Sequence, residues 1–242
     1  IAMLRLPAFV AGVLMIPAAA WAAMLLGGKR LGALLAAGFV AASSILVEYS
    51  VNARGYSMVC LATLLLLPIS ILLARRPKAT GLWIAWGLIS ITGLYTIPTM
   101  LQSVLLMALV MSITGGRKKL SQLLPRLLIV LLLTALISAA LYLPVIKENG
   151  LKPLIANRWI TPQPISTLPK SFAALCSELI DDWGRDNSWI ILLLLGAGTL
   201  LTIANGFRER RAIWFLPLIA LAVALMFVIL QRRVPPARAL LY

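Results

Sequence analysis

Long apolar blocks and short charged clusters alternate along the 242 residues of the chain. Each block is about 17 to 20 residues long, close to what a helix needs to cross roughly 30 Å of hydrocarbon at 1.5 Å per residue. No block contains a charged residue. The pattern predicts an all-α, polytopic transmembrane helical bundle with about eight spans, at residues 7–26, 31–47, 57–74, 80–96, 98–114, 127–144, 188–206 and 212–231.

The fourth and fifth blocks are separated by very little sequence, around Tyr95-Thr96-Ile97-Pro98. Together they would form a helix over residues 80–114, which is too long for one crossing. We therefore expect a tight hairpin at this point. We also expect one transmembrane domain over residues 1–242, and a chain that begins at Ile1 is expected to be a fragment of a longer protein.

The longest polar connection, residues 145–187, changes character along its length. Its first half is rich in proline, which predicts irregular structure. Its second half carries an apolar stripe at helical spacing, opened by Pro169 and closed by Gly184. The stripe consists of Phe172, Leu175, Cys176, Leu179, Ile180 and Trp183. We expect a short amphipathic interfacial helix, whose acidic residues Glu178, Asp181 and Asp182 either contact a ligand or form a solvated face balanced by Lys170 or Arg185.

Composition narrows the class of protein. Hydrophobic residues make up 62% of the chain and charged residues 12%, with a mean hydropathy of +1.00, which excludes a water-soluble enzyme. The net charge of +15 fits loops that face an anionic leaflet better than nucleic-acid binding. With no His and two Cys, the chain offers no zinc pattern. No cofactor is evident, and ligands for a divalent metal are not identifiable.

Positive charge is concentrated in four short connections on one side of the predicted spans. These connections carry twelve cations and one acid, Glu209. The cations are Lys29, Arg30, Arg75, Arg76, Lys78, Arg117, Lys118, Lys119, Arg126, Arg208, Arg210 and Arg211. By the positive-inside rule this side is cytoplasmic. The outer loop 145–187 and residue 242 are then expected to be extracytoplasmic, in a multi-pass protein of the plasma (bacterial inner) membrane.

The richest polar cluster on the outer side is residues 48–57, between the second and third spans. Continued helix would stack Glu48 and Asn52 at i, i+4, and Gly55 would allow the backbone to turn. Arg54 would present a planar fork of donors suited to phosphate. Alternatively, Arg54 snorkels to the interface and Tyr56 belongs to an aromatic belt. A second cluster, residues 231–238, holds Arg232, Arg233 and Arg238, and either grips phosphate or anchors to headgroups.

Several short motifs resemble a known family over roughly half of the chain, mainly from Leu4 to about Gly116, with one further motif at residues 235–238. They are Leu4-Arg5-Leu6-Pro7 with Gly12, Gly28-Lys29-Arg30, Tyr49-Ser50-x-x-Ala53-Arg54-x-Tyr56, Gly93-Leu94-Tyr95-Thr96 and Pro235-x-x-Arg238. They resemble motifs of the bacterial membrane glycosyltransferases of the GT-C class. Two groups of this class are meant: glycosyltransferase family 39, which is related to the protein O-mannosyltransferases, and the lipopolysaccharide-core glycosyltransferases. Where relatives carry a His after the Tyr-Thr pair, this chain has Ile97-Pro98.

The resemblance implies a polyprenyl-phosphate sugar donor, an extracytoplasmic active site and inverting transfer to a hydroxyl of a lipid, glycan or protein acceptor. Such a donor leaves a negatively charged phosphate, and we expect Arg54, Arg233 and Arg238 to contact it by charge-assisted hydrogen bonds, supported by Glu48, Asn52, Tyr56 and Tyr95. Its isoprenoid tail is expected to occupy a groove among kinked helices. The family's general base, an Asp or Glu, would lie upstream of residue 1, so no catalytic residue is named. The alternatives are a transporter or flippase of a lipid-linked or amphipathic solute, which would have discontinuous helices and inverted repeats, and a non-catalytic membrane subunit.

Overall fold

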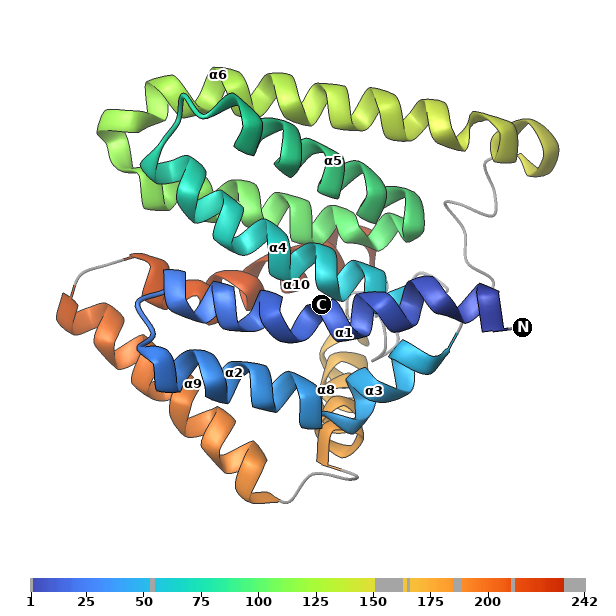
Figure 1. Ribbon diagram of the computed structural model, residues 1–242. Helices are drawn as coiled ribbons and strands as arrows, with labels where there is room; N and C mark the ends of the chain where they lie inside the picture. The colour runs from blue at the N-terminus through green and yellow to red at the C-terminus, as the bar shows by residue number, and fades with distance from the viewer. Residues whose placement is uncertain are drawn as a thin grey trace. The chain divides into compact units, whose positions relative to one another are not determined.

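A computed structural model describes residues 2–52, 55–150, 163–164, 166–184, 189–209 and 212–232. Within this described part almost all of the chain is helical and none of it forms a strand (Figure 1), which confirms the predicted all-α class. The elements are α1 (Ala2–Leu25), α2 (Arg30–Ala42), α3 (Ser44–Val51), α4 (Tyr56–Arg75), α5 (Thr80–Thr96), η1 (Pro98–Met100), α6 (Leu101–Asn149), α8 (Leu168–Gly184), α9 (Trp189–Glu209), η2 (Ala212–Phe215) and α10 (Leu216–Gln231).

Five of the described helical stretches are long and apolar enough to cross a membrane. They are Arg5–Leu25, Tyr56–Arg75, Pro98–Arg117, Lys119–Asn149 and Ile213–Gln231. A sixth is possible by length and composition if α2 and α3 together form one bent span. Helices α5 and α9 coincide with predicted spans but are not among the five. These stretches support an integral membrane protein, and the total of about eight spans stays a prediction.

The chain divides into two compact units, with the boundary between Tyr142 and Leu143. Unit 1 contains α1 to α5, η1 and most of α6, and unit 2 contains the rest of α6 and the elements up to α10. In unit 1, α1 packs against α2 and α4, and α4 packs against α5 (Figure 1). The core of unit 1 lies where α4, α5, η1 and α6 meet. Its fully buried members include Leu66, Trp86, Met100, Met111 and Leu123.

Two chain reversals position the helices of unit 1. The predicted hairpin after α5 is confirmed: α5 ends at Thr96, Ile97 is extended, and Pro98 opens η1. The second reversal lies inside α6, where Gly116 adopts φ 66° and ψ 171°, a conformation essentially restricted to glycine. Gly116 therefore separates α6 into two helical halves, which correspond to the predicted spans 98–114 and 127–144.

The predicted second span, residues 31–47, is not one continuous helix. Helix α2 ends at Ala42 and α3 starts at Ser44, with a bend of 57° between them. The break is at Ser43, whose backbone is extended at φ −71° and ψ 108°. Residues 43 and 44 are both serine, a residue type that is less favourable in a helix interior than at caps and turns. Prediction by hydropathy missed the bend because apolar sequence continues on both sides of it.

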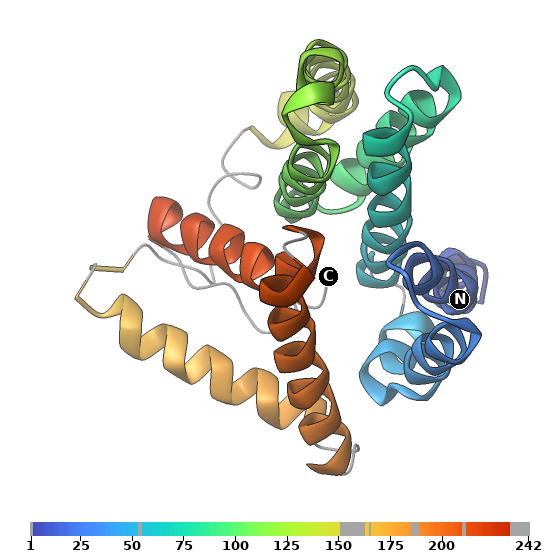
Figure 2. The same ribbon diagram turned by 90° about the vertical axis from the view of Figure 1, so that its left-hand side faces the viewer.

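In unit 2, α8 confirms the helix predicted from the apolar stripe, with Pro169 in its first turn and Gly184 as its last residue. Leu168 and Leu175 are buried, whereas Glu178 and Asp181 on the same helix are exposed. Figure 2 shows α9 (orange) inclined to α8 (yellow-orange). After α9 the chain turns through η2, where the rings of Phe207 and Phe215 meet edge to face at 5.0 Å.

Candidate functional site

The two ends of unit 1 differ in chemistry, and the first is cationic. Arg75 at the end of α4 donates from Nη2 to Leu25 O at the end of α1, over 3.3 Å. Lys119, just after the bend in α6, donates from Nζ to Arg75 O over 2.8 Å. Arg126 donates from Nη1 to Pro77 O over 2.6 Å. These bonds bring three of the four predicted cytoplasmic connections to one end of the unit, as the alternating topology requires.

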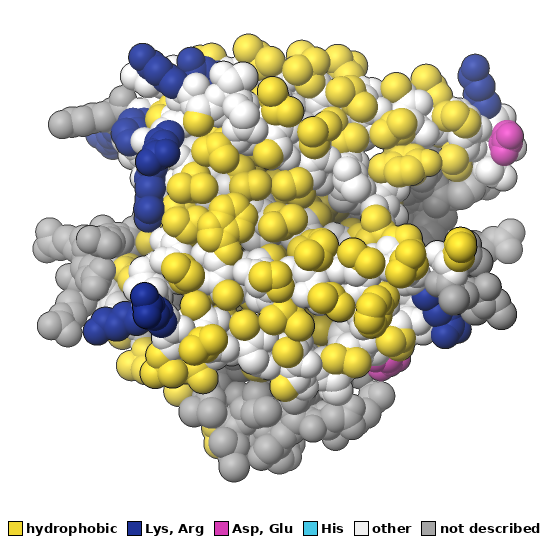
Figure 3. Space-filling view, viewed as in Figure 1, with side chains coloured by type: hydrophobic (Ala, Val, Ile, Leu, Met, Phe, Trp, Pro, Cys, Tyr) yellow, Lys and Arg dark blue, Asp and Glu magenta, His cyan; other side chains and the backbone are white. Residues whose placement is uncertain are grey.

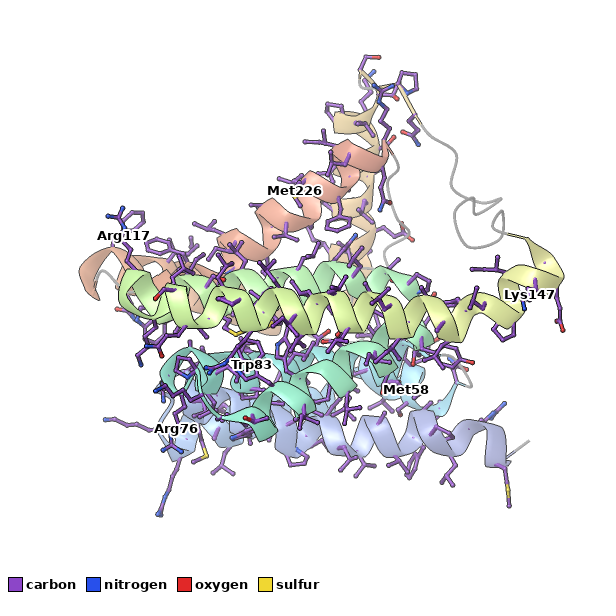
Figure 4. All side chains as sticks on the ribbon, turned by 90° about the horizontal axis from the view of Figure 1, so that it is seen from above. Met58, Arg76, Trp83, Arg117, Lys147 and Met226 are labelled. Atoms are coloured by element: carbon purple, nitrogen blue, oxygen red, sulfur yellow. The ribbon has the colours of Figure 1, made fainter. Side chains whose placement is uncertain are left out.

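The figures show the same separation. In Figure 3, dark blue side chains gather where α1, α4 and the first half of α6 end, and yellow apolar side chains cover the helices between the two ends. Figure 4 places Arg76 and Arg117 at the cationic end and Met58 toward the other. An apolar band between two polar ends is what a bilayer requires of a membrane protein.

The second end of unit 1 brings together two junctions that are far apart in the sequence. The α3–α4 junction contains Gly55, and a Cβ built there would overlap the Cγ2 methyl of Thr96 and lie 3.4 Å from Cγ1 of Ile97. The α5–η1 turn thus packs directly on residue 55. On the other flank, Ser50 lies against α1, because a Cβ at Gly12 would be 2.5 Å from the Cβ of Ser50.

Four of the five tyrosines of the chain lie in or beside these junctions. The rings of Tyr49 and Tyr56 meet edge to face, with centroids 5.1 Å apart. The rings of Tyr95 and Tyr142 are tilted by 52° at 5.7 Å. The hydroxyl of Tyr142 donates to the carbonyl oxygens of Leu94 and Tyr95, at 2.9 and 3.0 Å. This group, Tyr49, Tyr56, Tyr95 and Tyr142, marks what we name the tyrosine end.

Of the residues predicted to support a donor phosphate, four are described. Glu48 is exposed on α3, and Tyr95 is 51% exposed at the end of α5. Asn52 and Tyr56 are partly buried on either side of the α3–α4 junction. Helix α3 continues to Val51, and Asn52 is its C-cap, with φ −87° and ψ 138°. The expected stacking of Glu48 on Asn52 at i, i+4 stays a prediction.

The three predicted phosphate ligands, Arg54, Arg233 and Arg238, lie outside the described residues. Arg54 is bracketed by Asn52 and Gly55, which belong to the tyrosine end. In unit 2, the described neighbour Arg232 closes α10 in the left-handed region at φ 50°, and its carbonyl accepts from the backbone N–H of Gln163 over 2.7 Å. The end of α10 therefore contacts the loop 145–187. The sequence predicts that this loop and the end of α10 both lie on the extracytoplasmic side of the membrane.

An apolar groove of about 300 Å³ lies between α1, α4 and α5. Ten of its eleven lining residues are apolar, and the exception is Thr92. The groove is lined by Pro7, Val10, Ala11, Leu14, Met58, Leu61, Ala62, Leu65, Leu88, Ile89 and Thr92. Thr92 lies one turn before the end of α5, and Met58 (Figure 4) follows Tyr56 by two residues. One end of the groove is therefore adjacent to the tyrosine end.

The sequence analysis predicts a groove for the isoprenoid tail among kinked helices, but it identified neither the residues that line the groove nor Tyr142. Groove-lining residues have the same composition as ordinary lipid-facing or core residues, so hydropathy cannot distinguish them. Two signals are present in retrospect: Pro7 lies inside α1, and Ala11 and Ala62 are small residues at the lining. Tyr142 is separated from Tyr95 by 47 residues, and only the pairing of α5 with the second half of α6 brings the two together.

The described side chains also bear on whether the protein could hold a metal ion. In the part of the chain that the structure describes, no group of three or more His, Cys, Asp or Glu side chains is close enough to hold a metal ion. The polar groups that the tyrosine end offers are a carboxylate, an amide and phenol hydroxyls, from Glu48, Asn52 and the four tyrosines. Such groups are suited to hydrogen bonding with sugar hydroxyls and phosphate oxygens.

No protein-family model, curated protein or solved structure was found to match the chain. Its function is therefore inferred from the geometry of the tyrosine end and the groove, together with the sequence motifs described above.

Proposed function

We propose that the chain is part of an integral membrane glycosyltransferase of the GT-C class. It would transfer a sugar from a polyprenyl-phosphate donor to an acceptor hydroxyl at the extracytoplasmic face. One observation carries the proposal: the apolar groove between α1, α4 and α5 adjoins the polar tyrosine end. An amphipathic donor needs this pairing, since its isoprenoid tail requires an apolar channel and its phosphosugar head requires polar groups at the interface.

The groove would select the tail by shape. A lipid tail is already surrounded by hydrocarbon in the bilayer, so moving it into the groove yields little hydrophobic free energy. Selection then depends on van der Waals fit against the lining. Pro7 favours such a channel because its ring removes a backbone hydrogen bond within α1, and Ala11 and Ala62 leave room between α1 and α4.

The phosphate would be bound beside the α3–α4 junction. Negative charge builds up on the phosphate as the sugar leaves, and a guanidinium stabilises it through charge-assisted hydrogen bonds. Arg54 is the cation of this junction, and Asn52 and Tyr56 supply neutral hydrogen-bonding groups. Glu48, which is exposed, is suited to hydrogen bonds with sugar hydroxyls. Further phosphate contacts from Arg233 and Arg238 stay a prediction.

The proposal includes the finer topology. The bent pair α2–α3, together with α5 and α9, would complete about eight spans, and α8 would lie along the outer interface. Support for α8 comes from its buried Leu168 and Leu175 beside its exposed Glu178 and Asp181. Support for the alternation comes from the hydrogen bonds that gather the connections of unit 1 at one end.

Replacing Arg54 in the full-length protein tests the proposal. We expect Arg54→Ala to lower kcat for transfer from a polyprenyl-phosphate sugar by about 10²–10³, the effect of removing one donor to a developing oxyanion. Arg54→Lys should retain part of the activity, because it keeps the charge and loses the planar fork. The matched control is Arg5→Ala, at an exposed position in the first turns of α1. Unchanged transfer by Arg54→Ala, or labelling of a cysteine at residue 54 from the cytosol, would contradict the assignment.

A transporter or flippase of the same amphipathic solute is the second candidate. The observation that favours it is the bend of 57° between α2 and α3, since discontinuous helices often line transport sites. The Ser43 hydroxyl at this bend is buried and has no hydrogen-bond partner among the described residues. Movement of a fluorescent lipid-linked sugar across reconstituted vesicles, without an acceptor and without cleavage, would favour transport over transfer.

A further inference from the structure

We propose that the cationic end of unit 1 is a binding site for anionic phospholipid headgroups. This site is separate from the tyrosine end and does not depend on the proposed transferase activity. Nine cations belong to the three connections gathered there: Lys29, Arg30, Arg75, Arg76, Lys78, Arg117, Lys118, Lys119 and Arg126. Residues 26–30, 75–79 and 115–126 contain no Asp or Glu, so the chain supplies no local counter-charge.

Seven of the nine cations at this end fall into two groups. Of the other two, Arg75 donates to Leu25 O, and the side chain of Lys118 lies outside what the structure describes. Lys119 and Arg126 are partly buried and donate to the carbonyls of Arg75 and Pro77, so they join the end of α4 and the loop after it to the part of α6 that follows Gly116. Five others are exposed and have no acidic partner within the described ranges: Lys29, Arg30, Arg76, Lys78 and Arg117. The first group fixes the geometry, and the second is available to an anion.

Backbone groups add to the positive potential. Helix α2 begins at Arg30, after Lys29, and α5 begins at Thr80, after Ala79. Neither helix has a side-chain N-cap bond or an acidic residue in its first turn. Their first N–H groups and the positive end of each helix dipole are therefore open to an anion. Arg75 reaches Leu25 O, five residues before Arg30, which brings its guanidinium near the start of α2.

The surroundings favour a phospholipid over a soluble phosphate. The cations lie at the ends of α1, α4 and the first half of α6, which are long and apolar enough to span a bilayer, and this is the depth at which headgroups are found. Directly after Arg30, α2 exposes Leu31, Leu34 and Leu35 at 67%, 69% and 65%. A phosphate bound at the start of α2 would thus have its acyl chains against an exposed apolar face.

The experiment uses the purified full-length protein in a neutral detergent. Binding of short-chain phosphatidylglycerol is measured by native mass spectrometry and by titration, with phosphatidylcholine of the same chain length as the comparison lipid. The test variant is Arg30→Gln/Arg76→Gln. The matched control, Arg5→Gln/Lys147→Gln, removes two exposed cations outside the cationic end. With about 1 kcal/mol per cation near the surface, we expect the test variant to bind phosphatidylglycerol about 30-fold more weakly, and the control to bind like the wild type.

Several results would overturn the inference: equal weakening in both double variants, no weakening in the test variant, or equal binding of phosphatidylcholine. Competition by inorganic pyrophosphate at the same concentration as the lipid would assign the site to a soluble phosphate. Binding of an acidic peptide or RNA in preference to phosphatidylglycerol would overturn it as well. If Arg30→Gln/Arg76→Gln fails to fold, Lys78→Gln/Arg117→Gln removes two other exposed cations of the same end, and the same loss is required of it.

Discussion

The contact of Gly55 with the end of α5 can be tested by adding a single methyl group. In Gly55→Ala the new Cβ would overlap the Cγ2 methyl of Thr96. Residue 55 has φ −70° and ψ −1°, so alanine adds a steric conflict without backbone strain. Thr96 is not free to rotate away, because its hydroxyl donates to Thr92 O over 2.7 Å. The substitution must therefore move the α3–α4 junction or break this bond.

The expected cost follows from overpacking by one methyl group, which is about 1–3 kcal/mol. For a chain of this size, that corresponds to a decrease in Tm of about 2–12 °C. Thr96→Ser removes the overlapping methyl and keeps the hydroxyl that bonds to Thr92. In Gly55→Ala/Thr96→Ser we expect most of the lost stability to return, with a coupling free energy of at least about 1 kcal/mol between the two sites.

Thermal unfolding of the purified full-length protein in detergent, followed by circular dichroism, measures all four members of this double-mutant cycle. Gly81→Ala is the control, because a Cβ at that position near the start of α5 meets no atom within 4 Å. Two results would refute the reasoning: Gly55→Ala melting at the same temperature as Gly81→Ala, or additive effects of the two substitutions in the cycle.

Two further predictions concern stability and use the same melting assay. Gly116→Ala forces a side chain into the conformation at φ 66° and should cost about 1–3 kcal/mol; Gly38→Ala, in α2 with open space around it, should instead gain about 0.5–1 kcal/mol. Trp86→Phe removes the buried 3.0 Å bond from Trp86 Nε1 to the Ser70 hydroxyl and should cost about 1–3 kcal/mol, whereas Trp21→Phe, at a residue 36% exposed, should change stability by less than about 0.5 kcal/mol. Equal losses within either pair would contradict the explanation.

Hydropathy predicted helices well where a proline, a glycine or a charged cluster ends the apolar block. The third block, residues 57–74, corresponds to α4 at Tyr56–Arg75, and the hairpin before Pro98 forms as expected. The bend at Ser43 was not predicted, because serine is compatible with both helix and turn and its effect depends on tertiary packing. Likewise, the conformation of Gly116 determines how the two halves of α6 join, and hydropathy does not encode it.

The candidate site was predictable to the extent that it is contiguous in sequence. Glu48, Asn52 and Tyr56 lie within nine residues of one another, so their clustering was visible, and their backbone geometry was not. The contact of Gly55 with Thr96 and the approach of Tyr142 to Tyr95 depend on how whole helices align. That alignment is set by packing of the core around Trp86, Met100 and Leu123, whose residue types are common to many arrangements.

Helix α5 of unit 1 and the second half of α6, which continues past Tyr142 into unit 2, differ greatly in length, with consequences for the bilayer itself. Helix α5 has 17 residues and the second half of α6, Lys119–Asn149, has 31, or about 26 Å and 46 Å against roughly 30 Å of hydrocarbon. Both cannot match one flat membrane. We expect lipids beside α5 to be drawn inward while α6 tilts or extends into water. Such local thinning would shorten the path from the acyl region to the aqueous boundary next to Thr92.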